Sequence, residues 1–360
     1  AIFAASNLTR SQFLIWIGQK MSPDAPLYNM ALGYRISGPL DFDAFRAAFQ
    51  AVVDNSDAMR TVVEEVDGVP MQRSLPQLRY DVEVLDFRDK GDPTAAAESW
   101  AQYRCQVGFA LDQPLFDCKL LRIADDQDLW YMNQHHLIVD AWSATLIFKR
   151  VSEIYASILT GSSRPAPDLP AFRSFVEYER GLRNSKAYHR SMEYWRGKSA
   201  TPLDSTTFYG QPLSRDSTRS ERIFIELGEP RSRKLRQIAR QDDNRMITAD
   251  LTLFNIFAAL LFTWQYRVTR QKNLSIGTFA HNRSSDKFKS TIGMFIELFP
   301  LYAAIDDGET FSSLVRKLGE DILGFLSHAR AGTGNASLEH PYGVILNFIN
   351  ASFTDFAGLQ

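Results

Sequence analysis

The chain has 360 residues, of which 45% are hydrophobic and 23% charged, and its formal net charge at pH 7 is −2. This length predicts two domains, and the composition is typical of a folded globular protein. The near-neutral charge argues against nucleic acid or an anionic membrane as a partner. The most apolar long run, 251–264, is too short to span a bilayer and predicts a buried helix instead.

Cysteine usage and the first residues favour a cytoplasmic location. The two cysteines, Cys105 and Cys118, lack CxxC spacing, which favours a reducing compartment, although a single disulfide between them stays open. No basic stretch followed by an apolar segment is visible, so no signal peptide is predicted. The first residue is Ala1 rather than Met, and we interpret the sequence as a piece of a longer polypeptide.

Strands and helices alternate along the first part of the chain. The apolar pattern predicts helices at 9–17, 42–52, 93–107 and 143–159, and strands at 28–36, 60–66, 69–72, 80–85, 115–123 and 129–134. Asp67-Gly68 predicts a two-residue hairpin turn. Ser143 is expected to cap the last of these helices.

A linker is predicted at 160–170, because this stretch holds three prolines and a glycine but little apolar surface. Beyond it, the pattern predicts helices at 171–197 (in one or two pieces), 230–241, 248–266 and 310–326, and strands at 222–227, 273–279, 297–305 and 342–349. Similar mixtures on both sides of the linker predict an α/β protein with two domains, 1–165 and 166–360.

The densest cluster of reactive side chains lies at 133–143, where a strand is expected to give way to a helix. It contains His135, His136, Asp140 and Ser143. Histidine is the side chain best suited to proton transfer near neutral pH. Neighbouring residues of a strand point to opposite sides, so one histidine is expected to act while the other supports it. Asp140 could hold an imidazole tautomer, or pair with a cation elsewhere and fix the loop.

Other kinds of site have less support in the residue pattern. A metal ion bound by His136 and Asp140 lacks a third ligand at a suitable spacing, so no metal site is predicted. A serine nucleophile lacks the Gly-x-Ser-x-Gly elbow, and the sequence contains no glycine-rich phosphate-binding motif. On the residue pattern alone, a structural role for the two histidines stays open.

The residues at 135–143, His-His-Leu-Ile-Val-Asp-Ala-Trp-Ser, resemble the HHxxxDGWS signature of condensation domains from nonribosomal peptide synthetases. These domains belong to a superfamily that resembles chloramphenicol acetyltransferase. Further resemblances occur in the family's order, at 8–16, 26–29, 59–61, 277–278, 282–283, 292–296 and 300–301. The resemblance therefore extends over nearly the whole chain.

The resemblance implies two chloramphenicol-acetyltransferase-like lobes, each a mixed β-sheet with helices, arranged in a V with the active site at their junction. It implies a tunnel that the 4'-phosphopantetheine arms of a donor and an acceptor carrier protein enter from opposite faces. No permanently bound cofactor is implied. The implied activity is amide (peptide) bond formation in nonribosomal peptide or hybrid polyketide biosynthesis, beside other synthetase domains.

The resemblance also assigns roles to individual residues. His136 is the implied catalytic residue, which removes or orients the proton of the attacking group or steadies charge in the tetrahedral intermediate. Asp140 is expected to pair with Arg283 from the second lobe, through a bidentate and partly buried contact. Supporting roles are expected for His135, Trp142 and Ser143, with core packing as the alternative for Trp142.

The sequence departs from the family pattern at several points. Ala141 replaces the usual Gly, and Glu297 stands where Asn is common. With Gly293, these residues are candidates for the lining of the substrate tunnel. The stretch 328–342 lacks the family's His-Gln-Asp-type motif, and the chain ends soon after 347–350, so we expect the second lobe to be incomplete at its C-terminal end.

Alternative activities remain for this family. An ester-forming condensation would use a hydroxyl acceptor and the same histidine, and a stand-alone acyltransferase would use coenzyme A. Epimerising relatives usually have Ser before Trp, whereas Trp142 precedes Ser143 here. Catalytically silent relatives usually lose the second histidine, and cyclising relatives replace both histidines with aspartates. The retained His136 therefore favours condensation.

Overall fold

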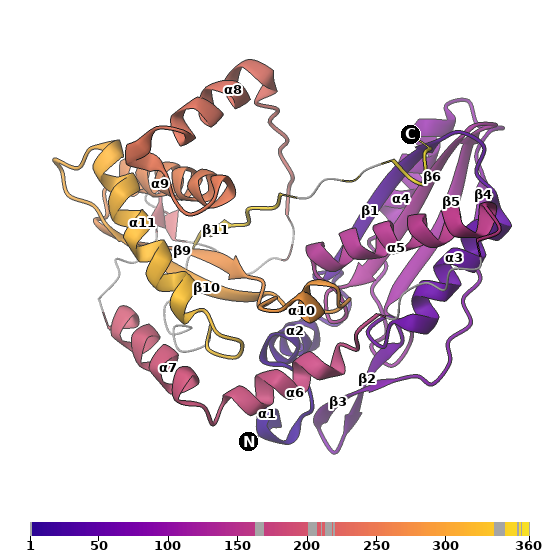
Figure 1. Cartoon of the computed structure of the whole chain (residues 1–360), viewed down its shortest axis with the longest axis horizontal. Helices are drawn as coiled ribbons and strands as arrows, with labels where there is room; N and C mark the ends of the chain where they lie inside the picture. The colour runs from indigo at the N-terminus through magenta and orange to yellow at the C-terminus, as the bar shows by residue number, and fades with distance from the viewer. Residues whose placement is uncertain are drawn as a thin grey trace. The chain divides into compact units, whose positions relative to one another are not determined.

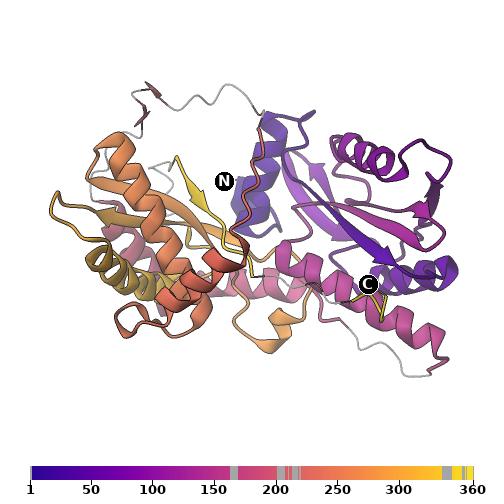
Figure 2. The same ribbon diagram turned by 90° about the horizontal axis from the view of Figure 1, so that it is seen from above.

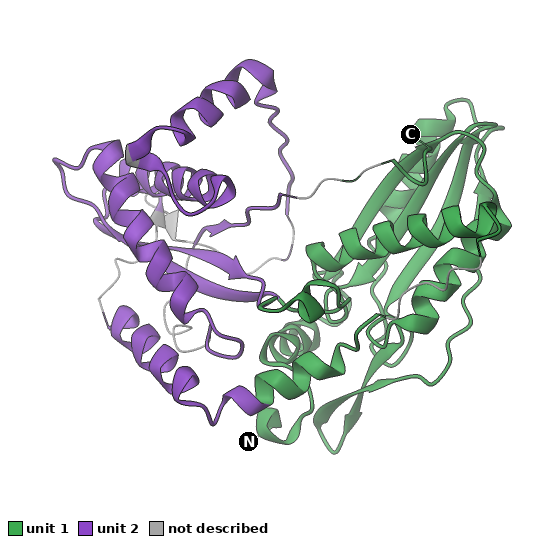
Figure 3. Cartoon of the chain, viewed as in Figure 1, with its two compact units in different colours: residues 1–180, 283–295, 351–360 green, residues 181–282, 296–350 purple. Residues whose placement is uncertain are grey.

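The computed structural model describes residues 2–162, 169–200, 207–209, 211–212, 218, 220–334, 343–350, 353 and 355–359. The chain divides into two compact units (Figure 3). Unit 1 comprises residues 1–180, 283–295 and 351–360, and unit 2 comprises 181–282 and 296–350. Each unit is therefore discontinuous in sequence, because segments 283–295 and 351–360 return to unit 1. Of the predicted linker, 163–168 lies outside the described residues.

Unit 1 is built on a four-stranded sheet in the order β1-β6-β5-β4, with a separate hairpin of β2 and β3. The strands pair antiparallel except for β4, which runs parallel to β5. Its elements are α1 (Ile2–Ala5), α2 (Arg10–Met21), β1 (Asn29–Ser37), α3 (Phe42–Asn55), β2 (Thr61–Val66), β3 (Val69–Ser74), β4 (Glu83–Asp86), α4 (Pro93–Arg104), β5 (Phe116–Ala124), β6 (Gln127–His135), α5 (Ala141–Leu159), most of α6 (Arg173–Leu182), and α10 (Asp286–Lys289).

Local sequence signals explain where several elements begin. The side chain of Thr9 accepts a hydrogen bond from the backbone N–H of Gln12, and the side chain of Gln12 accepts one from the backbone N–H of Thr9. These two bonds form a capping box at the start of α2. Asp41 caps α3 through the N–H of Ala44. Asp67 and Gly68 have φ angles of 50° and 77°, as a tight hairpin turn requires, so the hairpin prediction is confirmed.

Helices cover both faces of the unit 1 sheet, with α3 and α5 on one face and α4 on the other (Figures 1 and 2). Trp130 of β6 packs against Phe45 of α3 and Phe148 of α5. On the opposite face, Tyr131 contacts Trp100 of α4. Consecutive residues of β6 therefore point to opposite faces of the sheet, one toward α3 and α5 and the next toward α4.

Unit 2 contains a three-stranded sheet in the order β10-β9-β11, with β10 antiparallel and β11 parallel to β9. Its core joins this sheet to α9 and α11 through Phe262, Ile276, Leu301 and Leu318. Its elements are α7 (Lys186–Ser199), β7 (Thr207–Phe208), β8 (Gln211–Pro212), α8 (Gly228–Ala239), η1 (Asp242–Asn244), α9 (Ala249–Thr269), β9 (Asn273–Ala280), β10 (Glu297–Ala304), α11 (Phe311–His328) and β11 (Ile345–Leu346).

Mixed sheets with helices in both units confirm the predicted α/β class. The V arrangement and an active site at the junction stay predictions. Two strand predictions need correction. Residues 222–227 form no strand, and their alternating apolar side chains are exposed, as at Ile223. The strand predicted at 342–349 is shorter, because β11 contains only Ile345–Leu346, and Tyr342 lies outside the described residues.

None of the helices in the described part of the chain combines the length and the apolar character that crossing a membrane requires. The predicted buried helix is α9, whose inner face carries Ala258, Ala259 and Phe262. Its outer face is less buried than expected, since Leu260 and Trp264 are partly exposed.

Candidate active site

The two histidines lie at the predicted change from strand to helix. β6 ends at His135 and α5 begins at Ala141, so His136 belongs to the short connection. Asp140 has an extended backbone, and its Oδ1 accepts a 2.8 Å hydrogen bond from the N–H of Ser143. Asp140 is therefore the N-cap of α5. The prediction that Ser143 caps this helix is wrong, because Ser143 already lies in the first helical turn.

His135 is buried and fixed as a neutral ring. Its Nδ1 accepts a hydrogen bond from the N–H of Leu137 at 3.1 Å, and its Nε2 lies 3.4 Å from Oε1 of Gln19. Nε2 must then carry the proton, because Nδ1 is already an acceptor. Burial, with a smaller contribution from His136, lowers the pKa of His135 to about 3. His135 is therefore suited to support the loop rather than to exchange protons at neutral pH.

His136 is half-buried, and its backbone N–H donates to the carbonyl oxygen of Tyr28 at 2.8 Å. Burial lowers the pKa of its side chain, and the charge of Asp140 and backbone acceptors at His136 itself and Val139 offset part of this effect. The imidazole is neutral at pH 7 as a result. Among the described residues its buried Nδ1 has no hydrogen-bond partner of standard geometry. A neutral imidazole keeps one ring nitrogen with a lone pair that can accept a proton.

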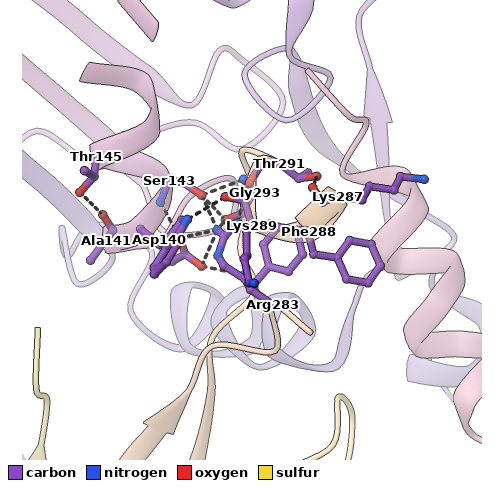
Figure 4. A network of polar contacts seen from close by, with 12 residues as sticks. Asp140, Ala141, Ser143, Thr145, Arg283, Lys287, Phe288, Lys289, Thr291 and Gly293 are labelled. Carbon is purple, nitrogen blue, oxygen red and sulfur yellow. Dashed lines mark hydrogen bonds and ion pairs between the residues drawn. The ribbon is translucent and has the colours of Figure 1, made fainter. Parts of the chain in front are cut away.

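Asp140 and Arg283 form a buried ion pair (Figure 4). Nη2 of Arg283 lies 2.8 Å from Oδ1 and 3.1 Å from Oδ2 of Asp140, and the side chains of Arg283 and Asp140 are 1% and 0% exposed. The predicted pair is therefore present. Its geometry differs from the expectation, since one nitrogen contacts both oxygens and the pair is fully buried. Both residues belong to unit 1, so the pair does not join the two units.

The segment 283–295 wraps around the guanidinium of Arg283. Nη1 donates to the carbonyl oxygens of Phe288 and Thr291 at 2.6 and 2.7 Å. The guanidinium lies 4.0 Å from the ring centroid of Phe295, a cation–π distance. The N–H of Phe295 also donates to Oδ2 of Asp140 at 3.1 Å. Asp140 is therefore held by a charge and by two backbone donors, and none of these described contacts is with His136.

Ser143 connects the same segment to the start of α5 (Figure 4). Its Oγ donates to the carbonyl oxygen of Gly293 at 2.7 Å, and accepts from the N–H of Gly293 at 2.9 Å and from Nη2 of Arg283 at 2.8 Å. These contacts use all the hydrogen-bonding capacity of the hydroxyl. Ser143 thus links segment 283–295 to the start of α5, and its supporting role for the histidine stays a prediction.

Trp142 and Ala141 occupy the first turn of α5. Trp142 is 45% exposed, and its Nε1 donates to the carbonyl oxygen of Lys289 at 2.9 Å. Core packing is therefore the wrong interpretation for Trp142, which instead fixes the end of α10. Ala141 is half-buried, and its carbonyl oxygen accepts from Oγ1 of Thr145.

Gly293 and Glu297 make tight local contacts. A Cβ atom on Gly293 would lie 2.0 Å from the ring of Phe172, so only glycine fits there. Glu297 begins β10 in unit 2, and its buried carboxylate accepts from the N–H groups of Gly332 at 2.8 Å and Gly334 at 2.7 Å. Both residues thus have structural partners. Lining of a tunnel by Ala141, Gly293 and Glu297 stays a prediction.

Sequence reasoning misses two glutamines that contact the histidine loop. Nε2 of Gln12 donates to the carbonyl oxygen of Leu137 at 2.9 Å, and Gln19 contacts His135. The capping-box pattern of Thr9 and Gln12 is visible in the sequence, but the contact with Leu137 is not. Within the described residues, no three His, Cys, Asp or Glu side chains gather closely enough to hold a metal ion.

Comparison with known proteins gives a consistent family match. A family model described as Condensation domain matches residues 5–338. The chain is 27% identical over 328 residues to a linear gramicidin synthase of Brevibacillus parabrevis, an alignment that covers 87% of this chain and 6% of that protein. It is 26% identical over 322 residues to phosphinothricin tripeptide synthetase of Streptomyces viridochromogenes, over 88% of this chain and 29% of that protein. The chain thus spans well under two thirds of these relatives.

Solved structures share the fold. The first condensation domain of the CDA synthetase matches with a TM-score of 0.81 at 21% identity, over 98% of this chain and 84% of that one. A mutant of the starter condensation domain of rhizomide synthetase, in complex with C8-CoA, matches with a TM-score of 0.79 at 24% identity, over 94% of this chain and 76% of that one.

Proposed function

The chain belongs to the condensation domain family, and on this premise we propose that it joins a carrier-bound acyl thioester to a carrier-bound amine. The amine nitrogen attacks the thioester carbonyl carbon, a C–N bond forms and the C–S bond breaks. The products are an amide on the acceptor carrier and a free thiol on the donor carrier. The proton lost by the amine ends on the departing sulfur, so no oxidant or external co-reactant is needed.

The observation that carries the proposal is the burial and the protonation state of the His136 side chain. A half-buried imidazole with a lowered pKa is neutral at pH 7, and its unprotonated ring nitrogen can accept the proton of the attacking amine. His136 then returns this proton to the sulfur. A positioned general base of this kind accelerates a reaction by about 10²–10⁴-fold. Alignment of two tethered substrates contributes further.

The remaining motif residues serve this histidine by holding its loop. The negative charge of Asp140 is compensated by Arg283, which leaves Asp140 as a helix cap and a fixed point rather than a proton acceptor. His135 stays neutral and supports the backbone. The proposal therefore places proton transfer on His136 alone.

The same proposal covers partners and location. The substrates arrive on the phosphopantetheine arms of donor and acceptor carriers, and the chain works beside other synthetase domains in the cytoplasm. A hydroxyl acceptor would give an ester through the same steps. Tunnel-lining roles for Ala141, Gly293 and Glu297 belong to this proposal, and such roles would influence which acceptor is used.

A reconstituted assay tests the proposal. A donor carrier is loaded with an acyl thioester and an acceptor carrier with an aminoacyl thioester, and both are followed by intact mass after addition of the chain. We expect the acyl mass to move to the acceptor carrier. A reaction of coenzyme A thioester with free amine at an equal rate would contradict carrier dependence, and transfer to a hydroxyacyl acceptor alone would indicate ester formation.

A further inference from the structure

We infer that Gln12 and Gln19 are positioning residues, which fix the backbone on both sides of His136 from one face of α2. The two glutamines are seven residues apart, which is close to two helical turns, so their side chains leave the same face. Both are buried although they are polar. The inference rests on the proposed function, because it concerns the histidine assigned to proton transfer there.

Gln12 holds the residue that follows His136. Its Nε2 donates to the carbonyl oxygen of Leu137 at 2.9 Å and to Oε1 of Gln72 at 3.1 Å. Its Oε1 accepts from the N–H of Thr9 at 3.0 Å. The amide is thereby fixed at both ends, so the carbonyl of Leu137 has a rigid donor rather than a mobile one.

Gln19 holds the residue that precedes His136. Its Oε1 accepts from the ring of His135, whose Nε2 carries the proton. Its Nε2 donates to the carbonyl oxygens of Ser22, Pro23 and Ala25 at 3.2, 3.0 and 3.2 Å. These bonds fix the turn that leads to Tyr28.

The carbonyl oxygen of Tyr28 accepts from the N–H of His136 at 2.8 Å. Through this bond, the turn held by Gln19 also sets the backbone of His136 itself. Rotation of the peptide groups around His136 would break one of these bonds, and the direction of its side chain is therefore set by α2. Misplacement of a catalytic group by about 1 Å can reduce a rate by about 100-fold.

Substitution by methionine keeps side-chain length and removes the polar atoms. In Gln12→Met and Gln19→Met, we expect kcat to fall by about 10- to 100-fold with little change in KM, because the substrate contacts remain. The loosened loop admits water, so the pKa of His136 rises toward its usual value. Gln50→Met is the matched control, since Gln50 also bridges a helix to a loop, through the carbonyl of Leu78 and the N–H of Tyr80.

The experiment measures kcat and KM in the carrier assay and titrates His136 by NMR in the full chain. The inference is supported if both variants have a lower kcat and a raised pKa of His136, while Gln50→Met shows neither change. Unchanged kcat and an unchanged pKa of His136 would overturn it, as would losses no larger than in the control. Gln12→Glu, which also cannot donate to Leu137, replaces Gln12→Met if that variant does not fold. If the wild-type chain forms no product, the proposed function fails, while the NMR titration still decides the positioning role.

Discussion

Arg283 and Asp140 lie 143 positions apart, yet one nitrogen of the guanidinium contacts both carboxylate oxygens at 2.8 and 3.1 Å. Both side chains are buried, so each charge depends on the other for compensation. The pair anchors segment 283–295 to the start of α5 within unit 1. It thereby fixes the loop that carries His136.

Removal of Arg283 should therefore be strongly destabilising. We expect Arg283→Met to lower the free energy of unfolding by about 3–5 kcal/mol, because the carboxylate of Asp140 stays buried without its partner. Urea denaturation measures this change. Arg236→Met, at an exposed pair with Glu229, is the control and should have little effect. An Arg283→Met protein as stable as the wild type would show that the pair has no structural role.

Stability should fall in mild acid because of His135. Its pKa is about 3 in the folded state against a usual 6.5, so between these values the unfolded state binds a proton that the folded state does not. Above pH 6.5 the neutral His135 does not weaken the folded state. As the pH falls from 6.5 toward 3, protonation of the unfolded state lowers the free energy of unfolding. Between pH 7.5 and pH 5 we expect a loss of about 2 kcal/mol from this group.

His135→Asn tests that assignment. Its side-chain oxygen can still accept from the N–H of Leu137, but it does not titrate. The pH dependence of the unfolding free energy should shrink by about the same 2 kcal/mol. His189→Asn, at an exposed position on α7, is the control substitution. Identical pH profiles for His135→Asn and the wild type would rule out this origin.

Gly293→Ala should destabilise unit 1 by steric overlap. Its Cβ would lie 2.0 Å from the ring of Phe172, and overpacking of this kind costs about 1–3 kcal/mol. Phe172→Leu should recover part of the loss in a double-mutant cycle, because it makes room for the added methyl group. Gly308→Ala, with no atom within 4 Å of its Cβ, is the control. If the losses of stability in Gly293→Ala and Phe172→Leu simply add in the double variant, the steric overlap is not their cause.

Glu297→Gln should disturb the backbone after α11. The carboxylate accepts from two N–H groups, at Gly332 and Gly334, whereas an amide would turn its NH₂ toward one of them. We expect one donor to lose its partner, at about 1–3 kcal/mol. Hydrogen exchange should then be faster at Gly332 or Gly334. Unchanged exchange with altered acceptor preference would favour the tunnel-lining role instead.

Much of the site is predictable because its signals are local or belong to a family pattern. The apolar repeat after His136 predicts α5, and the family resemblance implies the pair of Asp140 and Arg283. The N-cap prediction fails because Asp and Ser both favour that position. The structure distinguishes the two, because Asp140 has an extended backbone and accepts from the N–H of Ser143, whereas Ser143 lies in the first helical turn and contacts Gly293 and Arg283.

Other features depend on contacts that sequence periodicity does not encode. The alternation at 222–227 predicts a strand, but the described residues of this segment form none. The role of Gln12 needs the loop at Leu137, which is 125 positions away. The motif position of Glu297 predicts a place in a tunnel, while its carboxylate contacts Gly332 and Gly334. These contacts become visible only in three dimensions.

The proton-transfer role of His136 is the central claim, and single-turnover rates in the carrier assay test it most directly. Wild type, His136→Ala and the exposed-site control His189→Ala are compared with donor and acceptor carriers already loaded, after circular dichroism has shown that all three are folded. The account predicts that His136→Ala is slower by about 10²–10⁴-fold, while His189→Ala retains the wild-type rate. Equal rates for His136→Ala and the wild type would contradict it.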